Sequence, residues 1–118
     1  MQVIRHDPAE VEATQAPIFR GDVCRRVLIG ESESDQVTVL LVEFEAGGRN
    51  VFHRHTFDQV LYVTEGEGIV ASDTEEHVVR KGDIVIIPAG EKHWHGGTET
   101  TAMSHLAIGT PGETEIVE

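Results

Sequence analysis

Cysteine, basic side chains and long apolar runs are all scarce in this chain of 118 residues. Cys24 is the single cysteine, which excludes an intrachain disulfide bond and a thiolate metal cluster. Nine basic residues against 21 acidic ones give a formal net charge of −12, which would repel the phosphate backbone of a nucleic acid. No apolar run approaches the length of a membrane span, and the N-terminus shows no signal peptide. We therefore expect a cytoplasmic protein that binds neither nucleic acid nor membrane.

The chain also lacks any convincing segment in which apolar residues recur at helical spacing. Instead, short β-branched and apolar runs alternate with turns rich in glycine, proline, aspartate and glutamate. The predicted strands cover residues 24–29, 36–44, 51–55, 59–64, 69–71, 77–79, 84–87, 92–95 and 100–108. Residues 65–68 are predicted as a turn, and residues 84–87 as a fully buried strand. Many short strands predict an all-β sandwich or barrel, because closing the sheet removes exposed edges.

The length of the chain fits one domain with a single core, which we expect to cover residues 1–118. Residues 1–20 are predicted to be an irregular N-terminal segment, since Pro8 and Pro17 interrupt them. The polar residues 109–118 are predicted to be a peripheral tail. A domain this small gains from a second copy that buries apolar strand faces, so we expect a homodimer.

Histidines at strand spacing suggest a metal site. His53 and His55 point to the same side of a strand, because successive side chains alternate between its faces. Gln59 adds an oxygen donor at the start of the next predicted strand, and His93 and His95 share one face of a later strand. Two imidazoles, one oxygen donor and a third imidazole from a distant strand suffice to hold a divalent metal ion.

Two longer patterns around these histidines have a known spacing. The first runs Gly47, five residues, His53-x-His55, three residues, Gln59, six residues, Gly66; the second runs Gly82, five residues, Pro88-x-Gly90, two residues, His93. Together they resemble the two sequence motifs of the cupin superfamily. The resemblance implies a double-stranded β-helix, that is, a small jelly-roll barrel, with a metal ion inside its mouth.

The resemblance also implies the metal ligands, which would be His53, His55, Gln59 and His93. Two residues depart from the usual motifs: Gln59 replaces a glutamate, and Gly97 replaces an asparagine. A narrower resemblance, carried by residues 93–96 (His-Trp-His-Gly) and 101–108, is to a group of small bacterial cupins. That group includes hydroxynitrile lyases, which are similar in using glutamine as the oxygen ligand, and cupins found alongside carboxymuconolactone decarboxylases.

Gln59 would change the chemistry of such a site, because all of its ligands are then neutral and the ion keeps its full charge. Such a centre should bind anions well and polarise a carbonyl strongly, which favours Lewis-acid chemistry over redox cycling. Three nitrogens and one oxygen suit one divalent transition metal per chain (Mn, Fe, Ni, Co, Cu or Zn) and disfavour Ca or Mg. Four protein ligands also leave coordination positions open for a small-molecule substrate.

His105 and His95 are the candidate catalytic residues. His95 shares a strand face with His93, and His105 lies in the alternating set that contains Met103 and Ala107. A histidine near a dication would have a lowered pKa, which leaves neutral imidazole available as a base near pH 7. The alternative is that either residue orients a ligand or fills the core.

The leading hypothesis is an enzyme that uses the metal as a Lewis acid in lyase, decarboxylation or isomerisation chemistry, with hydroxynitrile cleavage as its most specific form. The first alternative is a metal-dependent dioxygenase or oxidase that uses iron or manganese. The second is a non-catalytic barrel that binds a small ligand or a metal, because a fold does not by itself imply a function.

Overall fold

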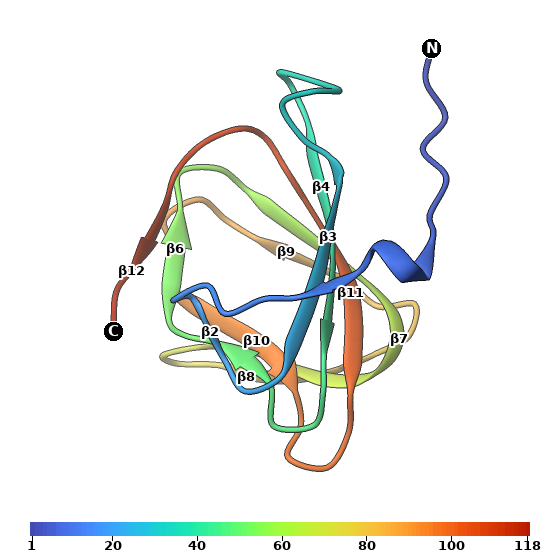
Figure 1. Ribbon diagram of the computed structural model, residues 1–118. Helices are drawn as coiled ribbons and strands as arrows, with labels where there is room; N and C mark the ends of the chain where they lie inside the picture. Colours follow the sequence, from blue (N-terminus) through green and yellow to red (C-terminus); the bar gives the residue numbers. More distant parts are fainter.

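Twelve β-strands and one short 3₁₀ helix form the secondary structure, and no α-helix is present, as the sequence predicts. A computed structural model describes residues 1–118 (Figure 1). In chain order the elements are η1 Pro8–Glu10, β1 Glu12–Ala13, β2 Phe19–Arg20, β3 Val23–Ile29, β4 Thr38–Phe44, β5 Arg49–Asn50, β6 His53–His55, β7 Gln59–Ser72, β8 Glu76–Arg80, β9 Ile84–Ile87, β10 His93–Gly97, β11 Met103–Gly109 and β12 Thr114–Ile116. None of these elements is a helix long and apolar enough to cross a membrane.

Strand β7 belongs to both of the sheets that make up the barrel (Figure 1). Its first part pairs with β11 and β9, and its second part pairs with β10 and β8. The first sheet has the order β1-β3-β4-β11-β7-β9, and the second contains β2, β5, β10, β6 and β12 beside β7 and β8. All of these pairings are antiparallel. The predicted all-β jelly-roll barrel is therefore confirmed.

The turn predicted at residues 65–68 is wrong, because β7 continues through these residues. Gly66 pairs with Met103 in the first sheet, and Gly68 pairs with Gly97 in the second. Gly66 has a φ of +80°, and a Cβ at this position would collide with the Ala102 carbonyl oxygen. Glycine therefore lets the strand bend from one sheet into the other without reversing its direction.

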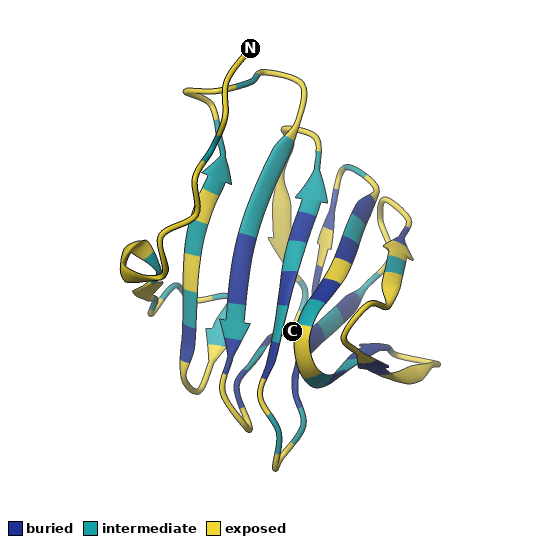
Figure 2. Ribbon diagram, turned by 90° about the vertical axis from the view of Figure 1, so that its right-hand side faces the viewer, coloured by how far each residue is buried: buried dark blue, intermediate teal, exposed yellow.

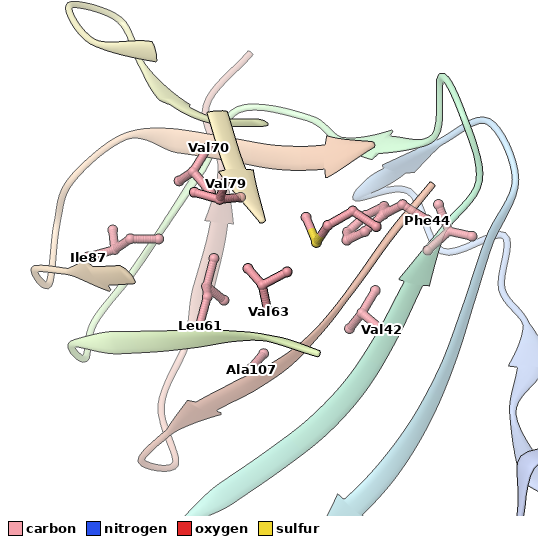
Figure 3. Packing of buried hydrophobic residues seen from close by; sticks show 10 residues of the cluster. Val42, Phe44, Leu61, Val63, Val70, Val79, Ile87 and Ala107 are labelled. Carbon is pink, nitrogen blue, oxygen red and sulfur yellow. The ribbon is translucent and has the colours of Figure 1, made fainter. Parts of the chain in front are cut away.

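Side chains along each strand alternate between the interior and the outside, which Figure 2 shows as bands of burial. In β7, Leu61 and Val63 are buried while Tyr62 between them is exposed. The core is a cluster of buried side chains, most of them labelled in Figure 3: Val23, Val42, Phe44, Leu61, Val63, Val70, Val79, Ile87, Met103 and Ala107. This cluster holds the two sheets together beneath the candidate site.

Strand β9 corrects a second prediction, because its continuous apolar run is not fully buried. Val85 packs against the core and Ile87 is buried, whereas Ile84 and Ile86 are 67% and 61% exposed. Ile84 pairs with Tyr62 of β7, so both side chains lie on the outer face of the first sheet. Only one face of this sheet packs against the core, so every second side chain of its strands is exposed, whatever their composition.

Both ends of the chain contain more regular structure than the sequence predicts. In residues 1–20, β1 pairs with β3, and β2 pairs with β5. In residues 109–118, β12 pairs with β6, which places Thr114 opposite His55 and Ile116 opposite His53. The C-terminal strand therefore lies directly beside the strand that carries two of the predicted metal ligands.

Candidate metal centre

Strands β6 and β10 bring three buried histidines together inside the barrel. His53 and His55 begin and end β6, and His93 at the start of β10 pairs with His53. Their ligand nitrogens all lie within 4.8 Å of one another, so the three residues could hold a metal ion. Gln59 at the start of β7 places its Oε1 atom 3.3 Å from His93 Nε2. The four predicted ligands thus meet at one point, and their role as ligands stays a prediction.

Main-chain carbonyl groups hold two of these imidazole rings. His53 Nδ1 donates to the Val51 carbonyl oxygen at 2.7 Å, and His93 Nδ1 donates to that of Glu91 at 2.8 Å. Because a carbonyl oxygen only accepts, Nδ1 carries the ring proton in both histidines and Nε2 keeps a free lone pair. Hydrogen bonds of this kind fix the tautomer and the orientation of metal-binding histidines.

His55 provides the observation that tests whether these residues fit a metal ion. Its Nδ1 atom lies 2.8 Å from Thr114 Oγ1, and its Nε2 atom is buried without any hydrogen-bond partner. An unpartnered buried polar atom costs about 1–3 kcal/mol. The lone pairs of Gln59 Oε1 and His93 Nε2 also face each other across 3.3 Å. A cation among these atoms would accept the unused lone pair of His55 Nε2 and would relieve the repulsion between the lone pairs of Gln59 Oε1 and His93 Nε2. The residues therefore fit a metal ion.

Burial keeps the three imidazoles neutral near pH 7. It lowers the pKa of His53 to about 3 and that of His55 to about 4, with a smaller contribution in each case from the neighbouring His93. Burial lowers the pKa of His93 as well, against the opposing effect of its hydrogen bond to the Glu91 carbonyl group. Neutral imidazole is the form that binds metal, so metal uptake at pH 7 requires no release of protons from these residues.

His95 and His105, the predicted catalytic residues, contact each other beside this cluster. His105 Nε2 lies 2.9 Å from His95 Nδ1. Asn50 Oδ1 accepts from the main-chain N–H of His95 at 2.8 Å, which turns Asn50 Nδ2 toward the His95 ring, 3.2 Å from Nε2. Asn50 Nδ2 also lies 3.4 Å from His95 Nδ1, so Asn50 faces both nitrogens of the ring. The three side chains thus form a buried hydrogen-bonded group.

The His95–His105 pair is also neutral at pH 7. Burial lowers the pKa of His105 to about 4, and burial together with repulsion from His105 lowers the pKa of His95 well below its ordinary value. The ring centroid of His95 lies 5.7 Å from that of His53 and 4.7 Å from that of His105. The pair is therefore in its neutral form close to the candidate metal site, and its catalytic role stays a prediction.

A cavity of about 190 Å³ adjoins both groups of histidines. Its polar wall consists mainly of His53, His55, Gln59, His95, His105 and Asn50. Its apolar wall consists of Ile18, Phe19, Leu40, Val42, Phe57, Ala107 and Ile108. Arg25 of β3 also lines it, near the N-terminal strands. A mostly apolar cavity with a few convergent polar groups is typical of small-molecule sites.

Three residues of this region were missed by sequence reasoning: Asn50, Thr114 and Arg25. Asn50 follows a glycine turn, where asparagine is ordinarily a turn residue. Thr114 belongs to the segment predicted as a tail, and Arg25 stands beside Arg26 in a predicted strand, where a charged side chain ordinarily faces solvent. Only the pairing of strands brings these residues to the site, and the spacing of residues in the sequence does not indicate which strands pair.

The barrel and its histidine cluster define a class of protein. Residues 40–109 match the family of cupin domains, and the chain belongs to this family.

Relatives of the chain include enzymes of more than one kind. It is 47% identical to (R)-mandelonitrile lyase from Granulicella tundricola over 70 residues, which cover 57% of this chain and 52% of that enzyme. It is 28% identical to an acireductone dioxygenase from Alcanivorax borkumensis, with 79% of this chain and 55% of that enzyme covered. The chain therefore spans about half the length of these two enzymes.

A solved structure with the same fold is that of a cupin-like protein from Thermotoga maritima. It aligns with a TM-score of 0.86 at 30% sequence identity, over 95% of this chain and 89% of that one. The whole barrel is therefore shared with a solved structure, and the likeness extends beyond the matched domain.

Proposed function

We propose that this protein is a metal-dependent enzyme of lyase type that acts on a small organic molecule. One divalent transition-metal ion per chain would be held by His53, His55, Gln59 and His93. The observation that carries the proposal is the buried, unpartnered His55 Nε2 atom beside two imidazoles whose lone pairs are free. When bound, the ion would supply Lewis-acid polarisation of a substrate oxygen.

The side chains around the cavity supply the remaining chemistry. His105 and His95 are neutral at pH 7 and can take up a proton, which the hydrogen bond between them lets the two rings share. Asn50 accepts from the main-chain N–H of His95 and places its Nδ2 atom beside the ring, and so positions the pair. Val42 and Ala107 add apolar surface to the cavity wall.

The most specific form of the proposal is cleavage of a hydroxynitrile, which the similarity to (R)-mandelonitrile lyase supports. The hydroxyl proton of the substrate passes to the His95–His105 pair, and the electrons of that O–H bond form the carbonyl bond. The bond to the nitrile carbon breaks with its electron pair on cyanide. Return of the proton from the pair releases hydrogen cyanide, so that atoms and charges balance.

Oxygen chemistry is the second candidate function, and the similarity to acireductone dioxygenase favours it. The neutral donor set argues against it, because it stabilises a trivalent ion less than a set that includes a carboxylate would. Dependence on dioxygen and on a redox-active ion therefore separates the two candidates.

The proposal is tested by a screen of small hydroxynitriles, lactones and diketones with metal-reconstituted protein, with and without dioxygen. We expect turnover that persists without dioxygen and with redox-inert zinc. His105→Gln should lower kcat by roughly 10²–10⁴-fold, the usual contribution of general acid–base catalysis, while the metal content is unchanged. Turnover that requires dioxygen and a redox-active ion would refute the Lewis-acid proposal.

A further inference from the structure

Arg25 stands at one end of a row of side chains that crosses the inner face of the first sheet. It lies opposite Val42 of β4, which in turn lies opposite His105 of β11. These three strands lie side by side in Figure 1. All three side chains line the cavity, and Arg25 is the only arginine, lysine or carboxylate that does so. The row therefore places one positive charge, on an exposed side chain, at the wall of the cavity that His53, His55 and Gln59 also line.

The guanidinium group of Arg25 forms no ion pair with an acidic side chain, and the same holds for Arg5 and Arg49. Four other arginines form ion pairs with glutamates: Arg20 with Glu118, Arg26 with Glu10, Arg54 with Glu115 and Arg80 with Glu67. Glu12 lies opposite Arg25 in β1, yet no ion pair joins them. The contact that Arg25 does make is with Phe19, whose ring centroid lies 5.9 Å from the guanidinium carbon. Phe19 also lines the cavity, so the guanidinium group lies beside an apolar part of the cavity wall.

We propose that Arg25 binds a carboxylate group of the substrate. The substrate class is then a small organic acid with a carboxylate at one end and a metal-binding oxygen at the other, an inference that rests on the proposed function. The paired N–H donors of a guanidinium group match the two oxygens of a carboxylate. Leu40 and Val42 lie between the two ends of the cavity and would cover the carbon skeleton of the acid.

The net charge of the chain also supports a carboxylate site at Arg25. At a net charge of −12, the chain as a whole repels small anions, so an acidic substrate needs a local positive site. Arg25 supplies that charge at one end of the cavity, and the neutral ligand set leaves the charge of a bound ion undiminished at the other. An arginine that is merely solvated at the cavity mouth would instead show no preference between an acid and its amide.

The experiment compares diacids with their monoamides on the metal-loaded full-length chain. Malonate, succinate, glutarate and adipate are titrated calorimetrically, each beside its monoamide. For at least one chain length, wild type should bind the diacid at least about tenfold more tightly than the monoamide, as expected for hydrogen bonds to charged groups. In Arg25→Met this ratio should fall to about 2, the statistical factor for two equivalent ends.

Two control variants isolate the position of the charge. Arg26→Met removes the same charge from the opposite face of β3 and should keep the wild-type ratio. Arg25→Lys keeps the charge without the paired donors and should retain part of the preference. A ratio that is equal in wild type and Arg25→Met at every chain length, in protein of unchanged melting temperature, would overturn the inference.

Failure of the proposed function is visible separately. Metal content is measured on the same preparations, and a wild-type chain without transition metal contradicts the proposed function. Butyrate and butyramide are then compared by NMR titration of the metal-free chain, where Arg25 acts alone. A preference for butyrate that is lost in Arg25→Met supports the carboxylate site, and the absence of any preference overturns it.

Discussion

Gln59 determines the charge that a bound ion presents to the cavity, because an amide oxygen carries no formal charge. We expect Gln59→Glu to keep the metal but to weaken the binding of small anions by roughly tenfold or more, since the added carboxylate removes one positive charge. Calorimetric titration of the metal-loaded protein with azide measures this effect. Gln36→Glu, at an exposed position, is the matched control. Equal azide affinity in Gln59→Glu and wild type would contradict the charge argument.

The buried histidines make the stability of the metal-free chain depend on pH. Burial lowers the pKa of His105 to about 4, below the value near 6.5 of an unfolded histidine. Its contribution is therefore fully present above pH 6.5 and is lost as the pH falls toward 4. Urea unfolding should show that the stability lost between pH 7.5 and pH 5 is smaller by about 2 kcal/mol in His105→Gln than in wild type.

His77 provides the control for this experiment, because its side chain is exposed. His77→Asn should keep the wild-type dependence on pH. An identical loss of stability in His105→Gln and wild type would show that burial of His105 does not depress its pKa in the folded chain.

Gly97 departs from the motif asparagine for a steric reason. A Cβ atom at this position would lie 2.5 Å from the Thr101 carbonyl oxygen and 2.8 Å from that of Glu45. Both neighbours belong to the main chain, so a side chain would require a shift of the backbone. The departure therefore reflects close packing of three main-chain segments and leaves the four candidate ligands in place.

At the scale of elements, strand β12 supports the candidate site through one side chain. Thr114 Oγ1 lies 2.8 Å from His55 Nδ1 and fixes the ring whose other nitrogen is unpartnered. Thr114→Val removes the hydroxyl group at nearly constant volume. It should weaken metal binding by about 10–100-fold, which is the usual effect of removing a hydrogen bond to a metal-binding side chain. Competition with a chelator of known affinity measures the change.

Thr110→Val is the control for the C-terminal segment, because Thr110 lies outside β12 and is exposed. It should leave the metal affinity of the wild-type chain unchanged. A wild-type affinity in Thr114→Val as well would show that the hydroxyl group plays no part in orienting His55.

The elements also show what could be predicted from sequence. The spacing of His53 and His55 is a local property of one strand, and the prediction that the two rings share a face is confirmed. The course of β7 was mispredicted, because Gly66 and Gly68 ordinarily indicate a turn and only pairing in two sheets reveals a bend. The contact of Thr114 with His55 depends on the pairing of β12 with β6, which no periodicity in residues 109–118 reveals.

At the scale of the whole molecule, the outer face of the first sheet remains available to a partner. Ile84 and Ile86 of β9 are exposed beside Tyr62 and Val60 of β7. Exposed apolar faces of this kind typically mark contact surfaces. We expect a homodimer through this face, as the small size of the domain also suggests.

Light scattering coupled to gel filtration measures the assembly. Ile84→Lys with Ile86→Lys should convert the dimer to a monomer, since both changes place a charge in the buried contact. Val78→Lys, at an exposed apolar residue of β8, should leave the dimer intact. A wild-type chain that is monomeric at micromolar concentrations would contradict the expected homodimer.

The metal content of purified protein tests the candidate site most directly. After reconstitution with a divalent transition metal and removal of the excess, elemental analysis should find close to one ion per chain in wild type and in His77→Ala. His53→Ala and His93→Ala should contain almost none, because each loses one of the three imidazoles that lie within 4.8 Å of one another. Stoichiometric metal in either of these two variants, or its absence from wild type, would contradict the site.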